Sequence, residues 1–166
     1  MSMEILEYPG ATVMGIEVVA RWQDLGAEVS RAWGRVFASS AELPVRASGQ
    51  LVEVSLEITE GRYRELLGAV VDRSEPCPDG FSVVRIAPQR LLFHRHEGPV
   101  VDIAKSFGAM LAWAEREGNT PTDFKLDVGY TPTGEETAHD LYVGLDPVMP
   151  WHRVRGAAQQ SRAEMR

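Results

Sequence analysis

The residues of this chain best suited to chemistry are acidic side chains on predicted strands, some of them close to tyrosines. Asp140 and Tyr142 stand two residues apart, and alternate residues of a strand face the same side. A carboxylate beside a phenol in an apolar cleft binds a cation, or acts as a general base for water. The alternative for each acid is a solvated outer face, and we expect at least one acid to line a cleft. The strand acids are Glu53, Glu57, Glu65, Asp127 and Asp140.

Aromatic side chains form the second candidate feature, because rings stack on flat ligands and attract cations. At helix positions such as Trp33 and Phe107 the stronger interpretation is hydrophobic core. Strand tyrosines are better candidates, since a tyrosine near a seam keeps a hydroxyl group that requires a partner. The predicted ligand-binding residues are Trp33, Phe37, His94, Phe107, Met110, Tyr130, Asp140 and Tyr142.

Histidine and cysteine give weaker signals. His94 and His96 face the same side of one predicted strand, a spacing that can hold a metal ion, but His139 and His152 are distant candidates for a third ligand. We interpret the pair as structural or surface histidines and expect neither a metal nor a cofactor. Cys77 lies in a turn-like stretch whose acidic neighbours raise a thiol pKa, which disfavours a catalytic nucleophile.

Hydrophobic periodicity indicates the elements that position these side chains. Apolar residues at helical spacing predict a helix over 27–40 and a second one that begins at Gly98-Pro99 and ends at Gly118-Asn119. Alternation and β-branched residues predict strands over 12–22, 51–58, 63–71, 81–86, 91–97, 124–130 and 139–145. The order strand, helix, strand, strand therefore occurs in both halves of the chain.

The halves also match in sequence, although chance is the alternative explanation. A shift of about 74 residues places Trp33-Gly34 on Phe107-Gly108 and 52–55 on 126–129, and one residue more places 65–67 on 140–142. Two repeats, about 10–72 and 81–146, predict an α+β fold: an antiparallel sheet of about eight strands with two helices on one face and a pseudo-twofold axis. The seam between the repeats is the expected place for a pocket.

Length and charge limit the function classes. The 166 residues fit a single domain over 1–148, followed by a tail over 149–166 that is either frayed or a short docked helix. The net charge of −7 argues against nucleic acid as a direct partner. No signal sequence and no apolar run of about 20 residues is present, so we expect no membrane partner and a cytoplasmic location. The expected partner is a small molecule, and the exposed sheet edges permit a monomer or a homodimer.

Five short stretches together resemble the gyrase-inhibitor-like (GyrI-like) effector-binding domain family. They are Gly15-Ile16, 31–34, 96–99, Ala112-Trp113 and 140–143, within a region from about Glu4 to Leu145. Family members occur alone or fused behind DNA-binding modules of AraC-type and MerR-type regulators, and this chain resembles the standalone form. The resemblance implies an SHS2/SOUL-like fold with an aromatic pocket at the junction of the halves. Such a pocket usually carries an acid and holds amphipathic, often cationic, aromatic compounds.

Two departures from the family pattern bear on that pocket. Val128 stands where relatives often carry Glu, and Asp127 beside it should point to the other face. Gly144 replaces a common Pro in the last strand. The pocket acid must then come from elsewhere in the chain.

The leading prediction is the binding of amphipathic aromatic small molecules, cationic ones among them, between the repeats. One alternative is a hydrolase that opens electrophilic toxins of the cyclopropane type. In it Asp140 or Glu57 orients water and Tyr142 or Tyr130 donates a hydrogen bond to the developing charge. A further alternative is a gyrase-inhibitor-like interaction protein. Haem binding, which is associated with the related SOUL fold, is a minor alternative.

Overall fold

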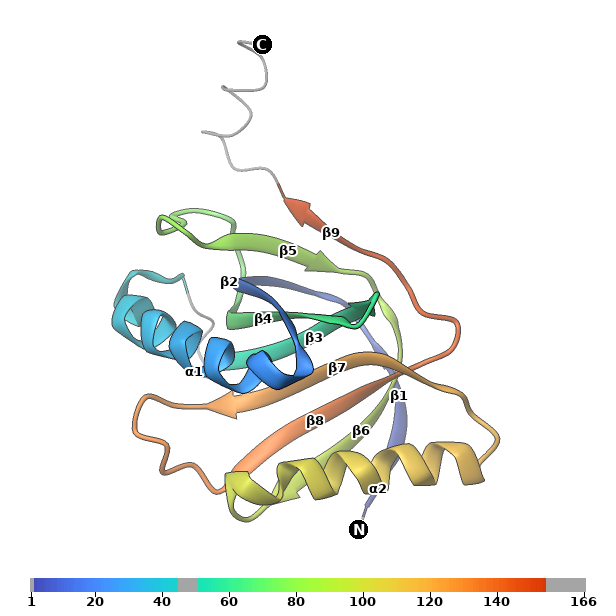
Figure 1. The fold of residues 1–166 in the computed structure, drawn as a ribbon. Helices are drawn as coiled ribbons and strands as arrows, with labels where there is room; N and C mark the ends of the chain where they lie inside the picture. Colours follow the sequence, from blue (N-terminus) through green and yellow to red (C-terminus); the bar gives the residue numbers. More distant parts are fainter. Residues whose placement is uncertain (1, 45–50, 155–166) are drawn as a thin grey trace.

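The computed structural model describes residues 2–44 and 51–154, which form one antiparallel sheet and two α-helices (Figure 1). The helices are α1 (Trp22–Ser39) and α2 (Ile103–Arg116), with short 3-10 turns η1 (Ser40–Glu42) and η2 (Val100–Asp102). The strands are β1 (Glu4–Tyr8), β2 (Ala11–Arg21), β3 (Leu51–Thr59), β4 (Arg62–Val71), β5 (Ser82–Ile86), β6 (Gln89–Glu97), β7 (Pro121–Tyr130), β8 (Ala138–Leu145) and β9 (Trp151–Val154). In the described part of the chain, neither helix combines the length and apolarity that a membrane crossing requires.

The strand order β1-β6-β8-β7-β3-β4-β2-β5-β9 contains an internal dyad. One repeat is β2-α1-β3-β4 and the other is β6-α2-β7-β8, and the two meet where β3 pairs with β7. In that pair Glu53 lies opposite Asp127, which is its own counterpart at a shift of 74 residues. The pseudo-twofold axis therefore passes between these two acids, and the predicted duplication is present in the fold.

The same shift holds in the outer strands and corrects one detail of the predicted alignment. Glu53 lies opposite Leu67, and Asp127 lies opposite Leu141. The register therefore keeps the shift at 74 through the second hairpin. The counterpart of Glu65 is His139, one residue before the predicted Asp140.

The two edge strands, β1 and β9, were not predicted, whereas β5 was. β1 pairs with β6, and β5 pairs with β2, so each repeat is bordered by the strand that precedes the other repeat. Residues 151–154, expected to be frayed or helical, form β9 on the far side of β5. The Arg153 guanidinium of β9 donates to the Glu17 carboxylate at 2.6 and 2.8 Å, which ties this strand to β2. Residues 155–166 of the predicted tail lie outside the described residues.

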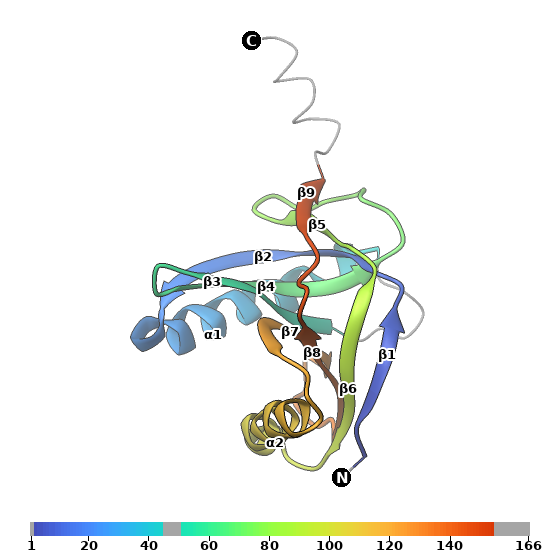
Figure 2. The ribbon, with the colours of Figure 1, turned by 90° about the vertical axis from the view of Figure 1, so that its right-hand side faces the viewer.

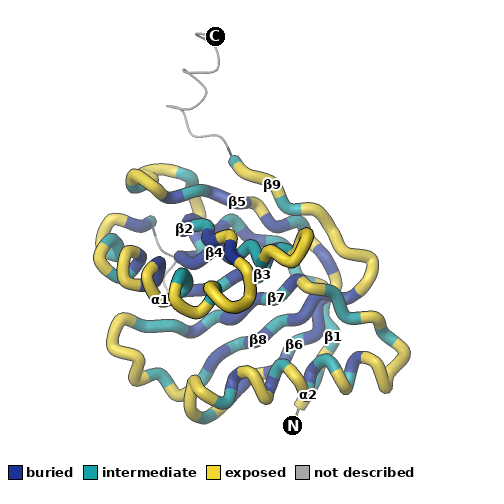
Figure 3. Tube along the Cα trace, viewed as in Figure 1, coloured by how far each residue is buried: buried dark blue, intermediate teal, exposed yellow. Residues whose placement is uncertain are grey.

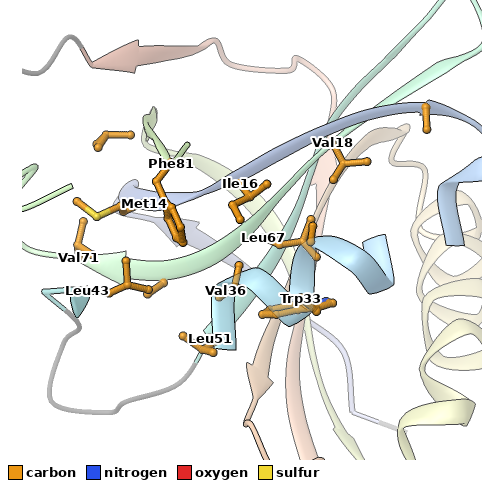
Figure 4. Close-up of a cluster of buried hydrophobic side chains, with 14 residues drawn as sticks. Met14, Ile16, Val18, Trp33, Val36, Leu43, Leu51, Leu67, Val71 and Phe81 are labelled. Atoms are coloured by element: carbon orange, nitrogen blue, oxygen red, sulfur yellow. The ribbon is translucent and has the colours of Figure 1, made fainter. Parts of the chain in front are cut away.

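The two helices cover separate parts of one sheet face. α1 packs on β2 and β4 and contributes Trp33 and the fully buried Val36 to a hydrophobic cluster (Figure 4). α2 packs on β6 and β8 and contributes Ile103 and Met110 to another. Val36 and Met110 stand 74 residues apart, so the repeat extends to core packing. Burying a side chain of this size stabilises the fold by about 1.5–3 kcal/mol.

The opposite sheet face holds a third cluster, which contains strand residues alone among those described. Val52 and Val54 of β3 belong to it, together with residues of β5 and β6 from distant positions in the strand order. Since residues of a strand alternate between faces, Glu53 and Ser55 must point to the helix side. The strands are largely buried, and each helix alternates between buried and exposed residues because one of its sides packs on the sheet (Figure 3).

The two helices lie on either side of the centre of the helix-facing sheet face. Within residues 2–44 and 51–154, α2 approaches β7 as well as β6 and β8, whereas neither helix closely approaches β3 or the other helix along its backbone. Figure 2 shows α1 and α2 apart from each other. The seam at β3 and β7 thus presents its helix-facing side chains between α1 and α2.

Candidate functional site

Six ionisable side chains meet on the helix side of the seam, and we call them the dyad cluster. β3 and β4 supply two acids, β7 supplies an acid and a tyrosine, and β8 with the loop before it supplies a histidine and an acid. The members are Glu53, Glu65, Asp127, Tyr130, Glu136 and His139.

A β-bulge brings Asp127 and Tyr130 to the same face. The pairing of β3 with β7 shifts between Leu51 and Val52, so that Gly129 is an extra residue in β7. Its φ of 147° suits glycine, and a Cβ there would lie 2.9 Å from the Ala138 carbonyl oxygen. As a result the Tyr130 hydroxyl donates to Asp127 Oδ2 at 2.7 Å. The prediction that Asp127 points to the other face is therefore wrong.

His139 joins two of the acids. Its Nδ1 lies 2.6 Å from Asp127 Oδ1, and its Nε2 lies 3.4 Å from Glu136 Oε1. Glu136 in turn accepts a hydrogen bond from Thr131 Oγ1 at 2.6 Å. Burial lowers the pKa of His139, but the hydrogen bond and charge of Asp127, followed by Glu136, raise that pKa by more. The imidazolium form therefore compensates Asp127 and Glu136.

The two acids of the first repeat have less compensation. Burial raises the pKa of Glu65 to about 7, although the Ser55 hydroxyl at 2.7 Å and the Lys125 charge oppose the rise. Burial raises the pKa of Glu53 to about 8, and the negative charges of Glu65 and Asp127 add to it. The hydroxyl of Tyr130 lies 3.4 Å from Glu53, farther than from Asp127. Counted over the described residues, Glu53 is the acid of the cluster without a close donor or cation.

Aromatic rings connect the dyad cluster to α1. The Trp33 and Tyr130 ring centroids lie 4.6 Å apart, and Phe37 stacks on Trp33 at 5.1 Å. Tyr130 also meets the His139 ring edge-on at 4.7 Å. Trp33 is 9% exposed, whereas Phe37 and Tyr130 are partly exposed. The structure thus brings together three of the predicted ligand-binding residues beside Glu53.

The other predicted ligand-binding residues lie elsewhere. Phe107 and Met110 belong to the core under α2, where Met110 is fully buried. Tyr142 packs between Tyr8 and Phe93 on the face away from the helices, at centroid distances of 5.5 and 5.2 Å. His94 is hydrogen-bonded to the Ser2 carbonyl oxygen at 2.7 Å.

The acids considered for water activation are both paired with arginines. The Arg95 guanidinium donates to Asp140 at 2.9 Å, and that of Arg64 donates to Glu57 at 3.2 Å. Burial, then the charges of Asp79 and Glu75, raises the pKa of the Cys77 thiol, in line with its predicted lack of nucleophilic character.

No family model matches this sequence, and no curated protein matches it. Solved structures do. SAV2435, bound to tetraphenylphosphonium, is 13% identical with a TM-score of 0.68, covering 89% of this chain and 95% of its own. The C-terminal domain of EcmrR is 13% identical with a TM-score of 0.63, and the match covers 89% of this chain and 98% of that domain. A hydrolase from Listeria innocua is 12% identical with a TM-score of 0.52, and the match covers 87% of this chain and 91% of the hydrolase.

This chain has the fold of those proteins. Identity this low shows the fold alone, and the predicted α+β class with two helices on an antiparallel sheet is thereby confirmed. The chemistry of the site has to be argued from the dyad cluster itself.

Proposed function

We propose that this protein binds amphipathic organic cations at the dyad cluster, as a member of the GyrI-like effector-binding family. One observation carries the proposal: Glu53 is a partly exposed carboxyl at the seam, and it has neither a close donor nor a compensating cation among the described residues. We keep the cytoplasm as the expected compartment.

A cationic ligand would supply what Glu53 lacks. The other three acids already have partners: Asp127 pairs with His139, Glu136 accepts from Thr131, and Glu65 accepts from Ser55. The site can therefore accept about one further positive charge, beside Glu53. A cation near Glu53 would also lie beside the rings of Tyr130 and Trp33, whose faces attract positive charge. Apolar groups on the ligand would contact Phe37 next to Trp33. These contacts favour a large aromatic cation over a small hydrated one.

The fold likeness supports the proposal because SAV2435, a protein of this fold, is bound to tetraphenylphosphonium. The hydrolase alternative has the fold of the Listeria innocua hydrolase in its favour. Two of the residues proposed for it, Asp140 and Glu57, are however held by arginines, and Tyr142 lies on the other sheet face. No observation on the described surface favours the interaction-protein alternative. Binding is therefore the function that the geometry supports best.

Tetraphenylphosphonium and tetraphenylborate test this proposal, since they share one shape and carry opposite charges. We expect the phosphonium to quench tryptophan fluorescence saturably at micromolar concentrations, because Trp33 adjoins the site. We expect the borate to bind at least about a hundredfold more weakly, because burying an anion beside four carboxyls is unfavourable. Equal affinity for both ions, or phosphonium binding weaker than about 1 mM, would remove the proposal.

A further inference from the structure

A hollow, which we call the corner cavity, lies beside the C-terminal end of β6. Its volume is about 520 Å³, within the range of small-molecule sites. It lies between the start of β1, the last residues of β6 and the start of α2, and β8 separates β6 from the seam strand β7. The lining residues are Ser2, Glu4, Phe93, His94, Arg95, His96, Glu97, Asp102 and Ser106.

His94 offers a free acceptor to this cavity. Its ring is 7% exposed, and Nδ1 lies 2.7 Å from the Ser2 carbonyl oxygen. A carbonyl oxygen only accepts, so Nδ1 carries the proton and Nε2 has a lone pair in the neutral ring. That Nε2 has no hydrogen-bond partner in the described part of the chain. It is not one of the fully buried, unpartnered side-chain atoms, so part of its surface is open to solvent. A ligand in the cavity would therefore meet a nearly buried imidazole that accepts a hydrogen bond.

His96 and Ser106 extend the acceptor surface. The Nε2 of His96 lies 2.9 Å from the Pro99 carbonyl oxygen and so donates to it. The Nδ1 of His96 lies 2.8 Å from Ser106 Oγ and accepts the hydroxyl proton. Because that proton is committed to His96, the lone pairs of Ser106 Oγ remain for a donor in the cavity.

The charges of the lining are predominantly negative. Glu4, Glu97 and the guanidinium of Arg95 border the cavity from the sheet face away from the helices, and Asp102 borders it from the helix side, where His94 and His96 lie. That guanidinium is already bonded to Asp140 at 2.9 Å and lies 3.9 Å from Glu97. Asp102 lies 3.8 Å from the exposed Lys105 ammonium group, a weak surface pair. A ligand that fits this lining carries positive charge and several N–H donors.

We propose that the corner cavity binds a small molecule with a primary ammonium group. The ammonium has three N–H donors and no acceptor, which matches His94 Nε2, the Ser106 oxygen and a carboxylate such as Asp102. The cavity thus selects by donors, whereas the dyad cluster is proposed to select aromatic cations without any need for N–H groups.

The test compares n-butylammonium with n-butyltrimethylammonium by two-dimensional NMR of the full chain. We expect n-butylammonium to shift the backbone amides of residues 93–97 and 102–106 saturably, together with the His94 ring Nε2 resonance. The trimethyl analogue, which has no N–H donor, should bind at least about tenfold more weakly. The Asp102→Asn variant, at a partly exposed position, should weaken n-butylammonium binding about fivefold, whereas Glu115→Gln at the far end of α2 should leave it unchanged.

Saturating tetraphenylphosphonium keeps this result separate from the dyad cluster. n-Butylammonium should bind equally well in its presence and in the Glu53→Gln variant. If the phosphonium displaces n-butylammonium, the ammonium site is the dyad cluster and the corner cavity proposal is overturned. Shifts that are equal for both ammonium ions, or that do not saturate below about 10 mM, overturn it as well.

Discussion

Glu53→Gln is expected to weaken tetraphenylphosphonium binding about a hundredfold at pH 8.5. Removing one partner of a partly buried charge pair typically costs 2–5 kcal/mol, and a hundredfold corresponds to about 2.7 kcal/mol. The variant keeps the shape of the side chain, so Tyr130 and Trp33 still offer their rings. Titration of tryptophan fluorescence at fixed pH measures both affinities. Asp140→Asn is the control, because Asp140 is bonded to Arg95 and the variant should bind as the wild type does.

The same carboxyl makes the affinity depend on pH. Burial, with the charges of Glu65 and Asp127, raises the pKa of Glu53 to about 8, so a proton must leave before the carboxylate can pair with a cation. We expect wild-type affinity to rise with pH between 6 and 8, approaching tenfold per unit, and to level off above that range. The Glu53→Gln profile should be flat. Wild-type affinity that does not change over this range would show that Glu53 is not the ligand's counter-charge.

The second large effect concerns stability, which should fall as pH rises from 5 to 8.5. Glu53 and Glu65 have folded-state pKa values of about 8 and about 7, above the ordinary value of 4.5. Carboxyls with raised pKa values favour folding at pH values below their ordinary pKa, and this contribution is lost as pH rises through the folded value. His139, whose pKa is also raised, acts in the same direction. Each pH unit over which a carboxyl is protonated only in the folded state contributes about 1.4 kcal/mol, so about three units for Glu53 and two for Glu65 predict a loss of roughly 7 kcal/mol in unfolding free energy.

Urea denaturation at several pH values measures this slope. Glu53→Gln should be more stable than the wild type at pH 8.5 and should lose much of the pH dependence, because a neutral amide replaces the buried charge. Glu57→Gln is the matched control on the same strand, since the Glu57 carboxylate is held by Arg64. We expect the control to keep the wild-type slope. A wild-type protein that is equally stable at both pH values would contradict the partly buried, uncompensated state of Glu53.

Hydrophobic periodicity was sufficient to predict most of the fold. Helical spacing located α1 and α2, alternation located the long strands, and the shift of 74 residues aligned Trp33 with Phe107. These signals are local or repeated, so they are present in the sequence without knowledge of strand pairing. β1 and β9 were missed because each contains one β-branched residue, Ile5 and Val154, whereas the similarly short β5 contains three.

The site was predicted less well because it depends on strand register. Strict alternation assigns Asp127 and Tyr130 to opposite faces, and one extra residue at Gly129 inverts that assignment. A glycine inside a predicted strand was the available signal for a bulge. The repeat related Glu53 to Asp127 in the sequence, but only the pairing of β3 with β7 shows that the axis passes between them. His139 enters the site through the β7–β8 hairpin register, which has no sequence motif.

Proton release on ligand binding is the most direct test that an uncompensated Glu53 carboxyl receives the cation. Calorimetric titration with tetraphenylphosphonium at pH 7, in buffers of different ionisation enthalpy, gives the number of protons released per ligand bound. A carboxyl with a pKa of about 8 is mostly protonated at pH 7, so the wild type should release close to one proton and Glu53→Gln close to none. Saturable binding without proton release, or equal release by both proteins, would contradict the account.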